Sequence, residues 1–204
     1  MVKKTKIIAY SDNICPFCYI GAKRIEKLKE EFNLEIEWRS FEIHPETPAD
    51  GLDFDKIFPA SDFEAKKNQL EYFGSDVGIN MNNTRLSNSR LSLQVGEFAK
   101  SQGKFEVFQQ EVFCVYFEEG KDIGRKDVLL EIAGKIGLNK AALITYLNSS
   151  EAEKSVKDSS RRAIDSGITG VPTFIIEDEA VVGAQPTDTL RMIILRHMET
   201  DENI

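Results

Sequence analysis

The chain of 204 residues has few cysteines, no long apolar segment and few basic residues relative to acidic ones. Its three cysteines are too few and too unevenly placed for a small domain that is stabilised mainly by disulfide bonds. No apolar run approaches the length needed to cross a bilayer, and the run Ile7–Tyr10 is too short for the apolar core of a secretion signal. We therefore expect a cytoplasmic protein with no membrane partner, in a compartment where thiols stay reduced.

Positive charge is also scarce. The sequence has 34 acidic and 26 basic residues, which gives a net charge of −8. A protein this acidic is repelled by a phosphate backbone, and no dense Lys/Arg run offsets that repulsion, so nucleic acid is excluded as a partner. With 41% hydrophobic and 29% charged residues, the composition is that of a soluble globular protein. The length suits one domain, or one domain carrying an insertion.

The first forty residues predict a strand–helix–strand unit. Residues 6–10 form a short β-rich run, and residues 34–39 alternate apolar and polar side chains as a strand does. Between them, small or apolar residues recur at helical spacing up to Phe32, with Asn33 closing the helix. A right-handed crossover makes the two strands parallel neighbours in one sheet.

The rest of the chain predicts several helices followed by a hairpin. Residues 41–60 contain three prolines and predict an extended connection. Apolar stripes predict helices around residues 91–99, 105–115, 128–136, 140–147 and 151–165, with Gly137 as a left-handed cap and Asn139 as an N-cap. Residues 173–176 and 180–182 flank a turn and predict a β-hairpin, and a last helix covers residues 187–198.

The strongest chemical signal is the motif Cys15-Pro16-Phe17-Cys18, placed between the first strand and the first helix. One helical turn brings the two sulfurs within bonding reach. Pro16 suits the first helical position, which makes Cys15 the N-cap. The unpaired N–H groups there and the helix dipole favour a thiolate. We therefore expect Cys15 to be the exposed attacking sulfur and Cys18 the buried resolving thiol.

A zinc site is the alternative for this cysteine pair. Zinc normally takes four ligands, and the rest of the chain offers Cys114, His44 and His197, none of them in a second paired motif. We therefore favour redox chemistry and expect neither a metal nor a bound cofactor.

A second part of the site is predicted far along the chain. Val171-Pro172 lies directly before a predicted strand, where a proline is usually an ordinary trans residue that starts the strand. Together with the cysteine motif, however, the pattern resembles the thioredoxin superfamily, in which a cis-proline loop faces the dithiol. In a cis arrangement, the Val171 peptide is expected to pair with an extended substrate backbone.

Over nearly its whole length the chain resembles the DsbA-like oxidoreductases of the FrnE-like branch. The motifs that carry the resemblance are Ser11–Gly21, Phe41–Glu46, Leu86–Leu91, Tyr116–Gly124, Gly170–Phe174 and Val182–Pro186. The resemblance implies an α/β protein: a thioredoxin-like fold with a mixed four-stranded sheet, interrupted by an α-helical domain. We predict that residues 1–45 and 151–204 form the thioredoxin-like domain and residues 46–150 the helical insertion. Relatives usually carry tryptophan where Phe17 stands, a change that leaves the redox pair intact.

The predicted function is thiol–disulfide exchange. Cys15 and Cys18 are the expected catalytic residues, and Pro16, Phe17, Val171 and Pro172 the expected substrate-binding residues. The expected partner is a protein that contains a thiol or disulfide, or a small thiol, and a reducing compartment favours reduction or isomerisation over net oxidation.

Two other functions remain open. The same superfamily includes kappa-class glutathione transferases and hydroxychromene-carboxylate isomerases, which use bound glutathione and typically have serine where Cys15 stands. The third hypothesis is a chaperone or sensor switched by the Cys15–Cys18 pair without turnover.

Several further residues have a structural and a functional interpretation. Cys114 is expected to pack as a small apolar residue, and His44 to be a surface or hydrogen-bonded histidine. Asp12 is expected to cap or form a turn, with proton acceptance as the alternative. Residues 88–90 either approach the site or cap a helix, and Gln185 is a candidate polar contact.

Overall fold

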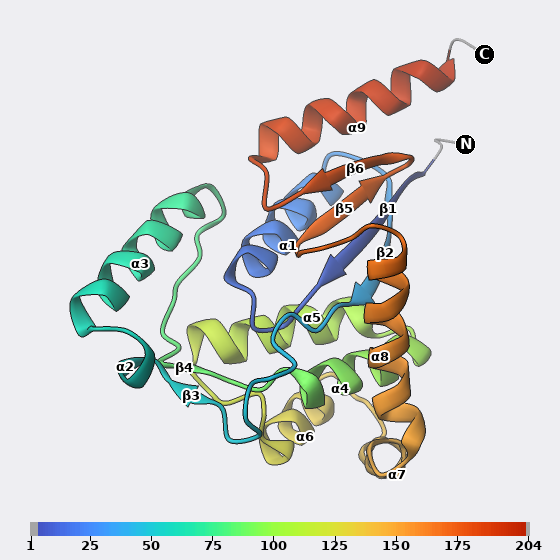
Figure 1. Ribbon diagram of the computed structural model, residues 1–204. Coiled ribbons are helices and arrows are strands. Elements are labelled where there is room, and N and C mark those ends of the chain that lie inside the picture. The colour runs from blue at the N-terminus through green and yellow to red at the C-terminus, as the bar shows by residue number, and fades with distance from the viewer. Residues whose placement is uncertain (1–3, 203–204) are drawn as a thin grey trace.

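A computed structural model describes residues 4–202, and its central feature is a mixed four-stranded sheet in the order β2-β1-β5-β6 (Figure 1). β1 and β2 are parallel, as the strand–helix–strand unit predicts, and β5 and β6 pair antiparallel as the predicted hairpin. β5 also pairs antiparallel with β1, which joins the two ends of the chain in one sheet. The strands of this sheet are β1 (Thr5–Ser11), β2 (Leu34–Ser40), β5 (Thr173–Ile176) and β6 (Glu179–Val182).

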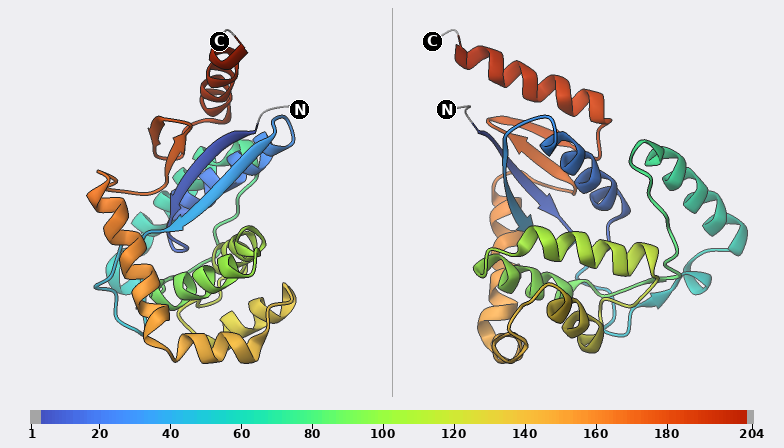
Figure 2. Two further views of the ribbon diagram at one scale, coloured as in Figure 1. Left: turned by 90° about the vertical axis from the view of Figure 1, so that its right-hand side faces the viewer. Right: turned by 180° about the vertical axis from the view of Figure 1, so that it is seen from behind.

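The helices fall into those that cover the sheet and those that form a separate layer. The helices are α1 (Pro16–Lys29), α2 (Phe54–Ile57), α3 (Ala60–Phe73), α4 (Arg90–Ser101), α5 (Phe105–Phe113), α6 (Lys126–Lys135), α7 (Lys140–Leu147), α8 (Ser150–Asp165) and α9 (Thr187–Glu202). Figure 2 shows the sheet and α9 at one end of the molecule, α4 to α7 at the other, and α8 running between them.

The side chains of β1 alternate between two apolar layers, because successive residues of a strand point to opposite faces. Ile7 and Ala9 are buried among residues of α1 and α9. Tyr10 instead packs with Ala163 of α8 on the opposite face. The sheet is therefore covered on both sides, as a buried parallel pair requires.

The largest apolar cluster lies outside the sheet and joins α1 to the helical layer. It contains Cys15, Cys18 and Ile20 from the start of α1, together with Phe108 and Val112 of α5. The cysteine motif therefore lies where the sheet layer meets the helical layer.

The predicted helices near the middle of the chain are confirmed, including their caps. Gly137 has a φ of +71°, and the Asn139 side chain accepts a hydrogen bond from the Ala142 N–H at 3.1 Å. The prediction that α1 closes at Asn33 is wrong, since α1 ends at Lys29. The Asn33 carbonyl already accepts from the Thr5 N–H at 3.0 Å, at the start of the parallel strand pair.

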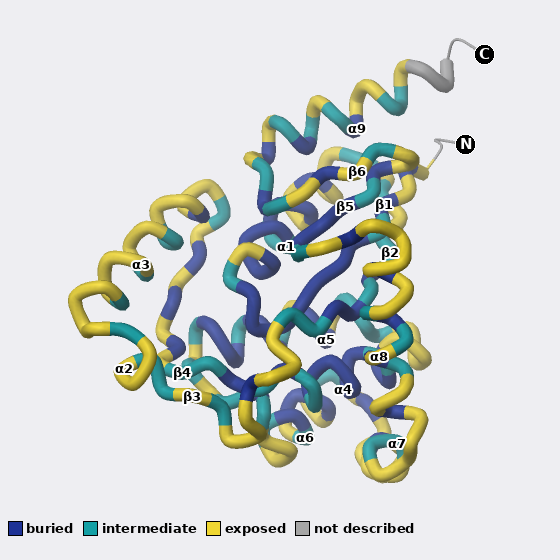
Figure 3. Tube along the Cα trace, in the orientation of Figure 1, coloured by how far each residue is buried: buried dark blue, intermediate teal, exposed yellow. Residues whose placement is uncertain are grey.

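The segment 41–60 is not entirely an extended connection. It contains strand β3 (Leu52–Asp53), which pairs with β4 (Arg85–Leu86), and the single-turn helix α2. α3 follows, and the sequence did not predict it because none of its residues is buried and so no apolar stripe marks it. Figure 3 shows α2 and α3 as a largely exposed arm. The division into domains at residues 45/46 and 150/151 stays a prediction.

Candidate active site

Cys15 is the N-cap residue of α1. It has extended backbone angles (φ −84°, ψ 115°), and Pro16 opens the helix after it. The Cys15 Sγ accepts a hydrogen bond from the Cys18 N–H at 3.4 Å. The same N–H also lies 3.0 Å from the Cys15 carbonyl oxygen, so it is shared between the two acceptors and holds the sulfur against the first turn of α1.

The prediction that Cys15 is exposed is wrong. Its exposed fraction is 5%, against 1% for Cys18, so both residues are buried. The cover comes from the loop before β5, where the Cys15 Sγ lies 3.7 Å from the Val171 carbonyl oxygen and donates to it. The order of exposure is still the predicted one, with Cys18 deeper.

Cys18 holds its proton more strongly than an ordinary thiol. Burial is the main cause that raises its pKa, and the neighbouring Cys15 sulfur adds to the effect. The backbone of Asp12 and the hydroxyl of Ser11 act in the opposite direction through hydrogen bonds.

The peptide bond between Val171 and Pro172 is cis. α1 approaches this loop very closely at Gly21, where an added Cβ would lie 3.0 Å from a Phe174 ring carbon and 3.3 Å from Pro172 Cγ. A glycine therefore allows α1 to pack directly under the loop that covers Cys15.

A groove runs beside Pro172. Its walls are Phe17 and Phe73 on one side and the loop 183–186 on the other, and its cavity volume is about 360 Å³. The Phe17 and Phe73 rings meet edge to face with centroids 5.7 Å apart. Phe17 is 44% exposed, so an apolar ring faces solvent next to the dithiol. Pro16, which directly follows Cys15, lines a second cavity.

A protein-family model described as the DSBA-like thioredoxin domain matches residues 6–194, which is most of the chain. The chain belongs to the DsbA-like thioredoxin family. The predicted fold class, a thioredoxin-like α/β fold with an inserted helical domain, is thereby confirmed. Membership of the FrnE-like branch stays a prediction.

Two relatives and one solved structure of similar fold cover most of the length of this DsbA-like protein. It is 29% identical to the uncharacterised protein YwbO of Bacillus subtilis (strain 168), over 92% of this chain and 94% of YwbO. It is 23% identical to a 2-hydroxychromene-2-carboxylate isomerase of Pseudomonas putida, over 83% of this chain and 84% of the isomerase. The crystal structure of a probable DsbA oxidoreductase from Streptomyces coelicolor superimposes with a TM-score of 0.84 at 24% identity, covering 94% of this chain and 89% of that one.

In the DsbA-like protein Arg24, which belongs to none of the sequence motifs, connects the walls of the groove. Arg24 is 3% exposed and donates to the carbonyl oxygens of Phe73 (2.6 Å) and Ala184 (2.7 Å), one on each wall. It also bonds the Asp76 carboxylate at 2.6 Å and thereby lowers the pKa of Asp76. A signal was present in the sequence, because Arg24 lies at helical spacing between Gly21 and Leu28 on the inward face.

Asp12 lies fully buried in the turn that leads into the cysteine motif. Its carboxylate accepts from the N–H groups of Ile14 (3.2 Å) and Ile43 (2.8 Å), and from the Ser89 hydroxyl (3.1 Å). Burial outweighs these three bonds and raises the pKa of Asp12 to about 6. Asp12 thus forms the predicted turn, and Ser89 reaches the base of the site, while Arg90 instead bonds Glu42 at 3.0 Å.

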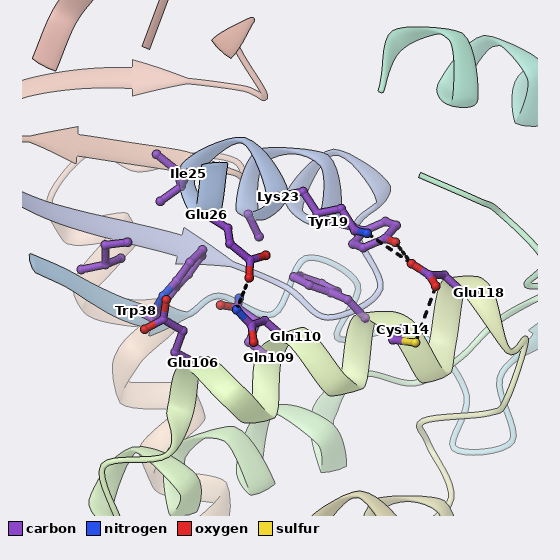
Figure 4. A pocket seen from close by; sticks show the side chains of 13 residues that line it. Tyr19, Lys23, Ile25, Glu26, Trp38, Glu106, Gln109, Gln110, Cys114 and Glu118 are labelled. Atoms are coloured by element: carbon purple, nitrogen blue, oxygen red, sulfur yellow. Dashed lines mark hydrogen bonds and ion pairs between the residues drawn. The ribbon is translucent and has the colours of Figure 1, made fainter. Parts of the chain in front are cut away.

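Cys114 lies apart from the dithiol, in a pocket between α1 and α5 with a cavity volume of about 280 Å³ (Figure 4). It begins a π-helical turn, Cys114–Glu118, and its Sγ lies 3.6 Å from a Glu118 carboxylate oxygen. Partial burial and then Glu118 raise the pKa of Cys114, which makes this thiol less reactive. The Tyr19 hydroxyl and Lys23 also contact Glu118, so the cluster ties α1 to the turn.

The remaining polar candidates contact nearby groups. His44 lies 3.0 Å from Glu46, and His197 lies 3.3 Å from Glu179. Gln185 donates to the Val182 carbonyl at 2.8 Å and lines the groove. Within residues 4–202, no three His, Cys, Asp or Glu side chains gather in a way that would hold a metal ion. No helix in that same range combines the length and the apolar character needed to cross a membrane.

Proposed function

We propose that this DsbA-like protein is a thiol–disulfide oxidoreductase in which Cys15 is the nucleophile and Cys18 the resolving thiol. The observation that carries the proposal is the position of Cys15: it caps α1, one turn before Cys18 and beneath the Val171 carbonyl. The family supports thiol–disulfide chemistry at such a pair.

The reaction is an exchange of two electrons. The Cys15 thiolate attacks one sulfur of a substrate disulfide, the substrate S–S bond breaks, and a substrate thiolate leaves. Cys18 then loses its proton and attacks the Cys15 sulfur, which releases the second substrate thiolate and leaves a Cys15–Cys18 disulfide. The substrate has gained two electrons, and the thiolates take protons from solvent. The reverse sequence oxidises a substrate dithiol.

The groove beside Pro172 supports binding of an extended substrate segment. In the proposed complex, Val171 pairs with the substrate backbone and the rings of Phe17 and Pro172 contact its side chains. Pro16 fixes the start of α1 beside the attacking sulfur.

The first test is reduction of insulin in the presence of a dithiol reductant. Wild-type protein is expected to accelerate precipitation of the reduced chains, and Cys15→Ser to fall to the uncatalysed rate because serine does not form a mixed disulfide. Cys114→Ser is the matched control and should keep the wild-type rate. Equal rates for wild type and Cys15→Ser would reject the proposal. A large conformational change on oxidation without turnover would favour a redox sensor.

The isomerase relative supports a second candidate, a glutathione-dependent isomerase or transferase. The Cys15–Cys18 pair argues against it, because such an activity does not need a resolving thiol. Cys18→Ala separates the two functions. Disulfide exchange stops at the mixed disulfide in this variant, whereas turnover that survives Cys18→Ala, with tight binding of glutathione, would establish the second candidate.

A further inference from the structure

A cavity of about 260 Å³ lies between the arm formed by α2 and α3 and the N-terminal end of α1. Its wall is largely apolar, and part of it consists of the rings of Phe54, Phe58, Phe63 and Phe117. In Figure 1 the arm stands beside the start of α1, the end that carries the cysteine motif. The volume is slightly below that of sites for drug-sized ligands and is enough for one aromatic group.

The cavity adjoins the attacking cysteine. Ile14 and Pro16, the two chain neighbours of Cys15, both line it. Phe17, the next residue, lines the groove beside Pro172 instead. The cavity and the groove are therefore lined by consecutive residues at the start of α1, next to Cys15.

The charge at the cavity is opposite to that of the protein as a whole. The protein carries a net charge of −8, yet the charged residues that line the cavity are Lys66 and Lys67 of α3. His44 also lines it and lies 3.0 Å from Glu46. The Lys66 ammonium lies 5.5 Å from the centre of the Phe58 ring. Within residues 4–202, no acidic side chain lines the cavity. The ion pairs found over that range likewise leave Lys66 and Lys67 without a carboxylate partner.

We propose that this cavity selects the substrate: a small disulfide in which an aromatic group carries a carboxylate. The ring fills the phenylalanine-lined wall and the carboxylate faces Lys66 and Lys67. A wholly polar peptide thiol leaves that wall unfilled, and a neutral aromatic disulfide leaves the lysines unpaired. The inference rests on the proposed function, since the bound disulfide accepts two electrons from Cys15 and Cys18 and leaves as two thiols.

The test compares two probe disulfides in single turnovers with the reduced protein. Dithiobis(nitrobenzoic acid) carries an aromatic ring and a carboxylate on each half, and dithiodipyridine carries an aromatic ring without the carboxylate. The double variant Lys66→Gln/Lys67→Gln is expected to lower the rate constant for the first probe about fivefold to tenfold relative to the second, the effect of losing two partly exposed charge contacts.

A matched control keeps the global charge equal. Lys126 and Lys154 are exposed lysines on α6 and α8, away from the cavity, and their double Gln variant has the same net charge. This control should leave the ratio of the two rate constants within about twofold of wild type. An equal change in both double variants, or no change in either, would overturn the substrate assignment.

Binding without chemistry separates this inference from the proposed function. The methyl thioether of thionitrobenzoate, which is one half of the first probe with its sulfur methylated, has the same ring and carboxylate but no disulfide. Its affinity can be measured by calorimetry. It should bind wild type and the control alike, and Lys66→Gln/Lys67→Gln more weakly by the same factor. If it binds in this way while neither disulfide oxidises Cys15 and Cys18, the cavity assignment stands and the oxidoreductase proposal fails. Equal binding to all three proteins rejects the cavity assignment alone.

Discussion

Arg24→Met is expected to lower the free energy of unfolding by about 3–4 kcal/mol, because it removes one partner of a buried ionic network. The guanidinium donates to the carbonyl oxygens of Phe73, Ala184 and Gln185, and each loses its donor in the variant. An unsatisfied buried carbonyl costs on the order of 1 kcal/mol. Asp76 is the other partner, but its side chain is 37% exposed, so water replaces part of what it loses.

The same variant should also loosen the groove beside Pro172. The Arg24 guanidinium lies over the Phe73 ring at 4.8 Å, and its partner Asp76 also accepts from the Thr187 hydroxyl at 2.8 Å. The Arg24 side chain therefore connects the two walls of the groove. Arg24→Lys keeps the charge but not the planar fork, and an intermediate loss of about 2 kcal/mol is expected. Urea unfolding measures each change.

Arg161→Met is the matched control, because Arg161 is an exposed arginine on α8. Its effect should stay within about 0.5 kcal/mol. If Arg24→Met also changed the free energy of unfolding by less than about 1 kcal/mol, the network around Arg24 would not hold the walls of the groove.

The sequence predicts the cysteine pair and its position at the start of a helix better than it predicts the segments that pack around the pair. The Cys15 N-cap follows from the proline after it, and the strands follow from their alternation, because both are local effects. The burial of Cys15 was not predicted, because its cover is Val171, which lies 156 positions away in sequence. Helix α3 was missed for a different reason: it buries no residue, so its sequence lacks the periodicity that marks a packed helix.

Asp12 combines a turn that is local in the sequence with a raised pKa that depends on the whole fold. The sequence predicts that Asp12 caps or forms a turn, and in the structure its bond to the Ile14 N–H, two residues on, forms that turn. Its full burial depends on Ser89 and on the backbone at Ile43, which arrive from other parts of the chain. Burial of this depth raises the pKa of Asp12 from 3.8 to about 6, and no local pattern predicts that shift.

The raised pKa of Asp12 makes a pH-dependent contribution to stability. The folded protein holds this proton up to about pH 6, whereas the unfolded chain loses it near pH 4. The favourable contribution is therefore fully present below about pH 4 and is lost as the pH rises through about 6. A shift of about two pKa units corresponds to about 3 kcal/mol. Asp76 and Asp127, whose pKa values are lowered, act in the opposite direction as the pH falls.

Asp12→Asn isolates this contribution, because the amide does not titrate. Urea unfolding of wild type and variant from pH 4 to pH 7 should show the advantage of wild type shrinking by about 3 kcal/mol over that range. Ser89→Ala removes a bond that stabilises the carboxylate, so it should raise the pKa of Asp12 further and move the loss to higher pH.

The exposed Asp165→Asn serves as the control, and the difference between it and wild type should stay flat across the same range. A constant difference between wild type and Asp12→Asn would mean that Asp12 stays ionised throughout. The three hydrogen bonds to its carboxylate would then outweigh burial, and the base of the site would hold a permanent negative charge beside Cys18. Removal of the Cys18 proton would in that case be harder, because a second negative charge would form next to the first.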